Sequence, residues 1–439
     1  MRRRLLLGAF GDPGHAFPMV ALGRALAARG HDVTLQTWRR WRDAVEAEGM
    51  RFAAAPEYHV FPTLERPLKP YQAVVRAAGE TLPLVDDVRP DAIVADILTL
   101  APALAGEIRG VPVATLVPHV WPVLERGWPP YAIGARRPRT ALGRALWRSV
   151  DRVTRAGLER GREELNGTRA RLGLAPLRRV HGGISDQLAL VATFPQLEYP
   201  RDWPASVHVV GPLAWELPCE DVELPDGDAP LVLVAPSTVH DPEFRLLRAT
   251  LRALAGEPVR VLAAWNRRPA PAGVELDVPR NARLVEWLSY SRVMPRCDVV
   301  VCHAGHGTVA RALEAGCAVV ACPAAGDMAE NAARVDWAGV GVRVPGRFVA
   351  AGPLRLAVRR ALGDAAMRAR ARELSAWAAG HDPAGRAAEL VEGFAAGKRA
   401  PAGAATRSAE TPRGAAAGRA EVAGGVERHG VGADAGSSS

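Results

Sequence analysis

The sequence predicts an α/β protein built from two doubly wound parallel sheets. A short apolar run, a glycine-rich turn, a run with helical spacing and a second apolar run follow one another over residues 5–37. The same alternation returns after residue 230, beyond a proline-rich stretch. Such strand–helix–strand units of about 30 residues are typical of parallel sheets, because a parallel connection has to cross one face of the sheet. Two sheets and an intervening linker follow from this pattern.

In the first half we expect a domain over residues 1–200. Its predicted strands are Leu5–Phe10, Asp32–Thr37, Asp91–Ala95 and Val113–Val117, and its predicted helices are Met19–Arg29 and Ala101–Arg109. The segment from Arg136 to Arg179 is strongly basic and has apolar residues at helical spacing. A solvated helical face explains these arginines, and a membrane-surface patch is the alternative.

In the second half the pattern restarts after six prolines between Tyr199 and Pro230, so residues 201–230 are expected to be a linker. A second domain is predicted over residues 231–395. After Phe394 the chain consists largely of alanine, glycine, serine and isolated charges, which are too weakly apolar to offset the entropy of ordering. Residues 396–439 are therefore predicted to be a disordered tail.

Composition excludes several classes of protein. No stretch reaches the roughly 20 apolar residues of a membrane span, and the apolar run after Arg4 is too short for a signal peptide. We therefore expect a cytoplasmic protein without stable membrane insertion. The formal charge of +9 is compatible with nucleic acid, anionic lipid or a phosphorylated small molecule, but no nucleic-acid motif accompanies it. The five cysteines lack zinc spacing and are expected to be free thiols.

The strongest signal for a ligand site is the segment Val299–Thr308. A valine-rich strand ends there in His303, Gly305 and Gly307 before an apolar helix. Free N–H groups and the helix dipole at such an N-terminus attract anions, which favours a diphosphate site with His303 and Thr308 as side-chain donors. The alternatives are an ordinary capped turn, or a metal site formed by His303 and His306. That pair supplies fewer than the three protein ligands usual for catalytic zinc.

Residues 287–341 resemble the nucleotide-binding half of family 1 glycosyltransferases, particularly the bacterial enzymes that decorate natural products. The matching segments are His303–Thr308, Glu314–Pro323 and Gly326–Ala332, and a weaker likeness extends over the chain to about residue 395. The resemblance implies the GT-B fold, in which two facing doubly wound, Rossmann-like domains are separated by a cleft. It further implies that the first domain binds the acceptor and the second domain binds a nucleotide-sugar donor.

The resemblance also implies which residues bind the donor diphosphate and sugar. The diphosphate contacts would come from His303 and from the stretch Gly305, His306, Gly307 and Thr308. The sugar hydroxyls would be bound by Asp327 and its neighbours Met328 and Asn331, since a carboxylate can accept from two hydroxyls at once. Met328 occupies a position where the family often has glutamine, which makes a deoxysugar donor more plausible.

Two further donor contacts are implied by position. Trp287 would lie near the nucleotide base, where an indole can stack, and an ordinary packed tryptophan is the alternative. Ser237 and Thr238 follow the first strand of the second domain and would lie near the phosphates. A helix-capping role explains these two hydroxyl residues nearly as well.

The resemblance places the catalytic base in the first domain. The loop Gly11–Pro18 matches the family loop whose histidine removes the acceptor proton, and His15 is the matching residue. Imidazole suits this task because its pKa lies near neutrality. Asp96 ends a predicted strand where the family places the carboxylate that orients this histidine, and a helix N-cap is the alternative role.

The acceptor is expected to contact first-domain loops at Glu57–Gln72 and His119–Tyr131. Their aromatic residues predict a flat or hydrophobic acceptor, bound by Trp121, Trp128 and Tyr131. The implied reaction is a single inverting displacement that needs neither a metal nor a cofactor beyond the UDP- or dTDP-sugar co-substrate. Two alternatives remain open: a non-catalytic nucleotide-sugar-binding or partner-stabilising relative, and a lipid glycosyltransferase at the membrane surface.

Overall fold

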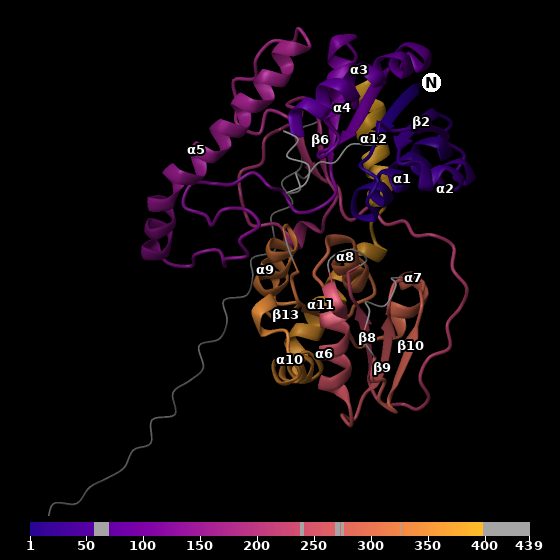
Figure 1. The fold of residues 1–439 in the computed structure, drawn as a ribbon, viewed down its shortest axis with the longest axis vertical. Helices are drawn as coiled ribbons and strands as arrows, with labels where there is room; N and C mark the ends of the chain where they lie inside the picture. The colour runs from indigo at the N-terminus through magenta and orange to yellow at the C-terminus, as the bar shows by residue number, and fades with distance from the viewer. Residues whose placement is uncertain (57–69, 238–240, 268–272, 274–275, 325, 398–439) are drawn as a thin grey trace, which may run out of the picture.

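The computed structural model describes residues 1–56, 70–237, 241–267, 273, 276–324 and 326–397. These residues form two parallel β-sheets, each covered by helices (Figure 1). The predicted pair of doubly wound α/β domains is confirmed. Thr238, most of the loop expected at 57–72 and the tail from residue 398 lie outside the described residues.

The first sheet has seven strands in the order β3-β2-β1-β4-β5-β6-β7, and every pairing is parallel. Its strands are β1 (Arg4–Gly8), β2 (Asp32–Thr37), β3 (Arg51–Ala54), β4 (Ala92–Asp96), β5 (Val113–Val117), β6 (Ala189–Val191) and β7 (Val207–Val209). The helices between them are α1 (Pro13–Ala28), α2 (Arg42–Ala47), α3 (Pro70–Val88), α4 (Leu100–Ile108) and α5 (Ala141–Arg171).

The second sheet has six parallel strands in the order β10-β9-β8-β11-β12-β13. Its strands are β8 (Leu231–Ala235), β9 (Arg260–Ala264), β10 (Ala282–Val285), β11 (Val299–Cys302), β12 (Ala318–Ala321) and β13 (Gly341–Arg343). Its helices are α6 (Arg245–Leu254), α7 (Tyr290–Val293), α8 (His306–Glu314), α9 (Met328–Ala338), α10 (Ala351–Gly363) and α11 (Ala365–Ala379). The central strands β8 and β11 are buried along their whole length, as expected for a sheet covered on both faces.

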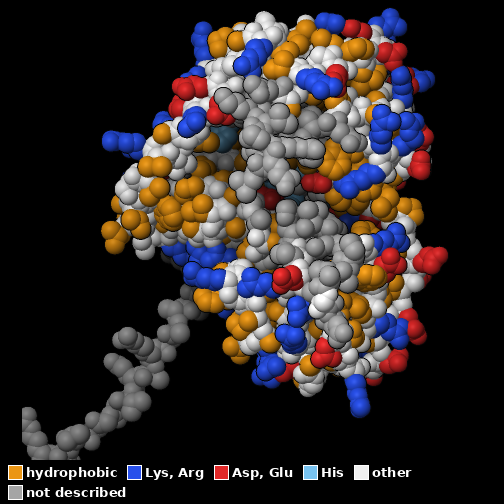
Figure 2. Space-filling view, viewed as in Figure 1, with side chains coloured by type: hydrophobic (Ala, Val, Ile, Leu, Met, Phe, Trp, Pro, Cys, Tyr) orange, Lys and Arg blue, Asp and Glu red, His pale blue; other side chains and the backbone are white. Residues whose placement is uncertain are grey.

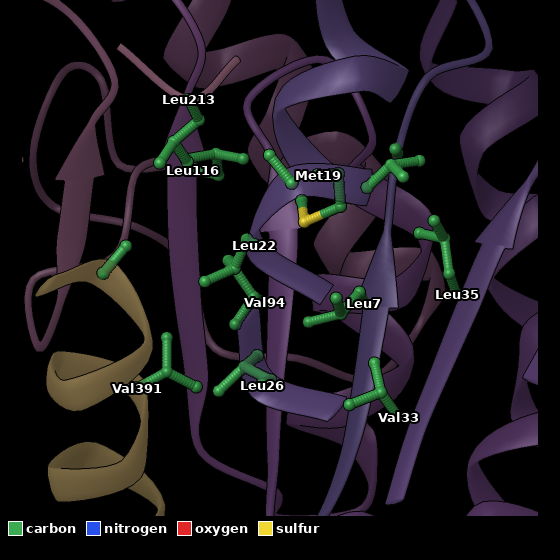
Figure 3. Close-up of a cluster of buried hydrophobic side chains, with 14 of the residues drawn as sticks. Leu7, Met19, Leu22, Leu26, Val33, Leu35, Val94, Leu116, Leu213 and Val391 are labelled. Atoms are coloured by element: carbon green, nitrogen blue, oxygen red, sulfur yellow. The ribbon is translucent and has the colours of Figure 1, made fainter. Parts of the chain in front are cut away.

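The core of the first domain forms where α1 packs on the sheet. Met19, Leu22 and Leu26 lie on one face of α1 and contact the apolar side chains of β1, β2, β4 and β5 (Figure 3). The last helix of the described chain, α12 (Pro383–Ala395), packs against the same core and contributes Val391. At the surface, the Glu392 carboxylate of α12 accepts two hydrogen bonds from Arg29 at 2.7 and 2.8 Å.

Two predicted domain boundaries need correction. The segment expected as a linker at 201–230 contains β7, which is the edge strand of the first sheet, because three residues are too few to produce a periodic signal. The predicted second domain extends to residue 395, but residues 383–395 form α12, which packs in the core of the first domain. The apolar face of α12 predicts that the helix packs against a core, but it does not predict which of the two sheets it packs on.

A third difference lies at the N-terminus of α1. The helix was expected to begin at Met19 after a glycine-rich turn, but it begins at Pro13. Proline is favoured in the first turn of a helix because an N–H there would have no partner within the helix. A second proline, Pro18, lies inside α1 just before the regular apolar spacing begins, so the pattern alone places the start of the helix too late. His15 therefore lies in the first turn of α1 and not in a loop.

The two domains meet through a buried ion cluster around Arg334 of α9. Its guanidinium donates to Glu330 on the same helix at 2.8 Å, and to Glu198 and the Leu197 carbonyl of the first domain, each at 3.1 Å. It also lies 3.5 Å from the centre of the Tyr199 ring. Arg334 is only 2% exposed, so every donor that it buries needs a partner.

We expect Arg334→Ala to lower the free energy of unfolding by about 3–5 kcal/mol, because it leaves the buried Glu330 without its cation and Glu198 with only Arg201 at 4.0 Å. The matched control is Arg76→Ala, which removes an exposed i,i+4 pair with Glu80 and should change stability by less than about 1 kcal/mol. Urea denaturation followed by tryptophan fluorescence measures both. Equal effects of the two substitutions would contradict the structural role of the cluster.

Candidate functional site

The site residues lie at the carboxyl ends of strands next to the point where each strand order reverses. In the first sheet this point lies between β1 and β4, and in the second it lies between β8 and β11. Loops leaving neighbouring strands in opposite directions open a crevice there, which is where ligands bind in open α/β sheets. His15 follows β1 and Asp96 ends β4, whereas Ser237 follows β8 and His303 follows β11.

His15 and Asp96 form a hydrogen-bonded pair. The Nδ1 atom of His15 lies 2.8 Å from Oδ1 of Asp96, whose side chain is fully buried. The second carboxylate oxygen accepts from the Phe10 N–H and the Thr99 hydroxyl, both at 3.3 Å. Because the carboxylate accepts, Nδ1 carries the imidazole proton, and the lone pair of a neutral ring is on Nε2. The N-cap of α4 is Thr99, so Asp96 does not cap this helix, and its orienting role stays a prediction.

The surroundings raise the pKa of His15 above its usual value. Burial on its own lowers this pKa, but the charge of Asp96 and its hydrogen bond act in the opposite direction and outweigh it. The carboxylates of Asp327 and Asp12 add to the increase. Because Asp327 belongs to the second domain, the pKa of His15 depends on charges from both domains.

His119 is a member of the site that the sequence analysis named only as the start of an acceptor loop. It follows β5, and its ring centre lies 6.2 Å from that of His15 in an edge-to-face arrangement. Its Nδ1 atom lies 2.8 Å from the Val120 carbonyl and 3.1 Å from the Tyr131 hydroxyl. Burial lowers the pKa of His119, against the opposing charge of Asp327. Its position two residues after the buried strand β5 was the available signal.

In the second domain the turn after β11 has a backbone that requires a small residue. Ala304 adopts a left-handed conformation with φ of 62°, and a Cβ atom on Gly305 would collide with Nε2 of His303. The imidazole of His303 therefore lies directly against the Gly305 backbone at the N-terminus of α8. Its Nδ1 atom lies 3.4 Å from the carbonyl of Ala235 on the neighbouring strand.

His303 and His306 are directed toward different partners. The Nε2 atom of His306 donates to the Ala192 carbonyl of the first domain at 3.1 Å, and burial lowers its pKa to about 4. The imidazole is thus neutral and forms a contact between the domains, while Gly307 and Thr308 continue the first turn of α8. Among the described residues, no group of three or more His, Cys, Asp or Glu side chains is placed to hold a metal ion.

The residues predicted to bind the sugar gather at the N-terminus of α9. Asp327 precedes the helix, and its Oδ2 atom accepts from Nδ2 of Asn331 at 3.3 Å. The same amide donates to the carbonyl of Ala304 at 3.1 Å, which links this helix to the turn after β11. Met328 is partly buried and packs against the core of the second domain.

The predicted nucleotide contacts lie along the remaining strand ends. Ser237 is buried after β8, and Trp287 is half-buried after β10 with the Arg267 guanidinium 5.9 Å from its ring centre. A cavity of about 140 Å³ lies beside His303. It is lined in part by Asp241 and Arg245, which are not among the predicted site residues. No sequence signal marks these two residues, because they flank an irregular start to α6.

The three aromatic residues expected at the acceptor site have different surroundings. Trp121 is buried against Trp203, and Trp128 is buried against Tyr199 with the guanidinium groups of Arg137 and Arg201 4.9 and 4.7 Å from its ring centre. Both indoles therefore pack within the protein. Tyr131, in contrast, contacts the site: its hydroxyl lies 3.1 Å from Nδ1 of His119, whose ring packs edge-to-face against His15. The acceptor role of these residues stays a prediction.

Comparison with known proteins agrees with this arrangement. Residues 256–392 match the C-terminal domain of the erythromycin biosynthesis protein CIII-like family. The chain is 30% identical to 4'-demethylrebeccamycin synthase of Lentzea aerocolonigenes, over 90% of this chain and 100% of that protein. It is 31% identical to O-mycaminosyltylonolide 6-deoxyallosyltransferase of Streptomyces fradiae, over 89% of this chain and 97% of that protein.

Solved structures share the fold across the whole length. The calicheamicin glycosyltransferase CalG4 superposes with a TM-score of 0.69 at 24% identity, covering 91% of this chain and 100% of that one. The glycosyltransferase VinC in complex with dTDP superposes with a TM-score of 0.61 at 18% identity, covering 89% and 99%. The chain therefore belongs to the natural-product glycosyltransferases of the GT-B fold.

Proposed function

We propose that this glycosyltransferase transfers a sugar from a nucleoside diphosphate to a hydroxyl of a small natural-product acceptor, in one inverting step that needs no metal and no further cofactor. The observation that carries the proposal is the His15–Asp96 pair, which holds an imidazole with its Nε2 lone pair available beside Asp327 of the opposite domain. The name of the Streptomyces fradiae relative and the dTDP in the VinC complex support a dTDP-deoxysugar as the donor.

In this mechanism Nε2 of His15 removes the proton of the acceptor hydroxyl as its oxygen attacks the anomeric carbon. The new carbon–oxygen bond forms while the bond to the β-phosphate oxygen breaks, and the electron pair of that bond leaves with the diphosphate. Asp96 stabilises the imidazolium that forms, since its carboxylate faces the Nδ1 proton. Attack opposite to the leaving group gives inversion at the anomeric carbon.

The leaving diphosphate would be stabilised at the N-terminus of α8. The helix starts at His306, so the N–H groups of its first turn have no partner within the helix and are available to an anion. His303 lies against this turn and adds a donor. Dipoles that are already oriented before the reaction stabilise developing charge without reorganisation, which is why the proposal needs no divalent ion.

The first test is release of nucleoside diphosphate from a panel of UDP- and dTDP-sugars with phenolic and polyketide alcohols, in the presence and absence of EDTA. We expect release with at least one donor and acceptor pair, and an equal rate with the chelator. A rate abolished by EDTA and restored by a divalent cation would contradict metal independence. Tight nucleotide binding without release from any pair would favour a non-catalytic relative.

Substitution of the proposed base separates chemistry from binding. His15→Ala should lower kcat by roughly 10²–10⁴-fold while donor affinity is retained, because the lost group acts only on the acceptor proton. Steady-state kinetics and calorimetric titration of the nucleoside diphosphate measure the two quantities. An unchanged kcat would eliminate His15 as the base.

The dependence of kcat on pH follows from the environment of His15. The imidazole must be neutral to accept a proton, so kcat falls as the pH decreases through its pKa. That pKa is raised above 6.5, although burial alone lowers it, because the charge of Asp96 is the largest of the opposing contributions. Asp96→Asn should therefore lower kcat and also shift the fall in kcat on the acidic side of the pH profile to lower pH. If this fall stays at the same pH, a group other than His15 controls it.

The turn after β11 offers a test of the donor site. Gly305→Ala should raise the KM for the donor at least about tenfold, since the added Cβ displaces His303 from the N-terminus of α8. The control is Gly363→Ala at the end of α10, where a Cβ meets no atom within 4 Å and the KM should not change. A donor KM unaffected by Gly305→Ala would show that the position of His303 is unimportant for binding.

A further inference from the structure

A segment of the first domain crosses the domain boundary and packs on the helix at the proposed sugar site. Residues 131–137, called here the strap, lie between β5 and α5 of the first domain but contact α9 and β13 of the second. On the face shown in Figure 2, basic side chains gather along the domain boundary, at the end of α5 that is nearer to α9 (Figures 1 and 2). Neither α5 nor another helix of the described residues has the length and apolar character needed to cross a membrane.

The backbone of the strap fits closely against the first turn of α9 at Gly134. This buried glycine has a φ of 66°, and a Cβ atom on it would lie 2.9 Å from both the Cβ atom and the carbonyl oxygen of Ala329. The position therefore requires glycine for space as well as for its left-handed backbone. The Gly134 carbonyl also accepts from the Arg343 guanidinium of β13. The strap is thus held by both elements, and Ala329 is only two residues from Asp327.

Two arginines fix the far end of the strap. Arg136 binds Asp336 of α9 through both carboxylate oxygens, at 2.8 and 3.2 Å. Bidentate pairing of this kind fixes direction as well as distance. The guanidinium of Arg137 lies 5.6 Å from the centre of the Tyr199 ring, and that ring packs edge-to-face on Trp337 of α9 with 5.0 Å between the ring centres. The strap and α9 are therefore joined both directly and through Tyr199.

The near end of the strap carries Tyr131 into the site. Its ring packs against the core of the second domain, while its hydroxyl lies 3.1 Å from Nδ1 of His119. Burial raises the pKa of Tyr131, and the charge of Asp327 raises it further. The same carboxylate acts on the pKa values of His119 and His15. The strap thus connects the histidines of the first domain with the carboxylate proposed to bind the sugar.

We propose that the strap is a positioning element of the transfer reaction, which fixes the histidines of the first domain relative to the sugar-binding end of α9. This inference rests on the proposed function, because it concerns the geometry of the same site. Groups misplaced by about 1 Å can slow a reaction about 10²-fold. The diphosphate site proposed at α8 is not contacted by the strap residues described above, so loosening the strap should slow transfer without weakening nucleotide binding. A purely structural brace would affect stability and leave the kcat of folded protein unchanged.

The first test compares two glycine substitutions. G134A forces the strap away from Ala329, whereas the control G173A, just after α5, has a similar φ of 72° and no atom within 4 Å of the added Cβ. Both variants bear the cost of a left-handed alanine, so the difference between them isolates the contact with α9. We expect G134A to lower kcat at least about tenfold relative to G173A, while the Kd of the nucleoside diphosphate in calorimetry changes by less than about twofold.

The second test exchanges charges without changing the backbone of the strap. R136D places two carboxylates opposite each other and should lower kcat about fivefold, and D336R in the same chain should restore most of the lost rate. The control is R160D, which removes the exposed pair with Glu164 on α5 and should leave kcat unchanged. Circular dichroism and thermal denaturation establish that each variant is folded, and the exchange decides the question if G134A is not.

Three outcomes would contradict the inference in different ways. Equal kcat values for G134A and G173A, or an exchange that restores nothing where G134A does not fold, would overturn the positioning role and leave the proposed function intact. A fall in kcat accompanied by an equal loss of nucleotide affinity would assign the strap to donor binding instead. No release of nucleoside diphosphate by the unmodified chain from any pair of donor and acceptor would contradict both the proposed function and the positioning role.

Discussion

The structure depends on one constraint: every strand in both sheets is parallel to its neighbours. All carboxyl ends of a parallel sheet emerge at one edge, and the loops with chemical groups have to lie there. In the first domain this constraint collects His15, Asp96 and His119 from three strands that are adjacent in space and widely separated in sequence. In the second it places His303 and Asp327 on loops that follow neighbouring strands.

The polar contacts between the domains explain how these two edges are held together. His306 belongs to the turn proposed to bind diphosphate, yet its imidazole donates to a backbone carbonyl of the first domain. Arg334 is one turn along α9 from Asn331, and its guanidinium is bound by carboxylate and carbonyl groups of the first domain. Both helices at the proposed donor site are thus tied to the first domain, α8 through its first residue and α9 through Arg334 near its middle. Any separation of the domains has to break buried polar contacts, and such contacts are costly to leave unmade.

Much of the fold could be predicted from the sequence, because strands buried on both faces are continuous apolar runs and the helices between them have a clear period. His15 and Asp96 could be paired only through the resemblance, since 81 residues separate them and no local pattern joins them. His119 could have been predicted by the rule that polar residues after parallel strands meet at one edge of the sheet. The packing of Trp121 and Trp128 could not be predicted, because an aromatic residue in a loop gives no indication of which side it faces. The domain of α12 could not be predicted either, because an apolar helix face does not specify which sheet it packs on.

The position of α12 has a consequence for how the chain is made. The first domain is discontinuous, since its core contains residues near both ends of the described chain, including Leu7 and Val391 (Figure 3). During synthesis the second domain emerges complete before the helix that covers α1 is available. The apolar side chains of α1 that face α12 lack this cover until α12 itself has been synthesised. The first domain can therefore be completed only after the second domain has been made.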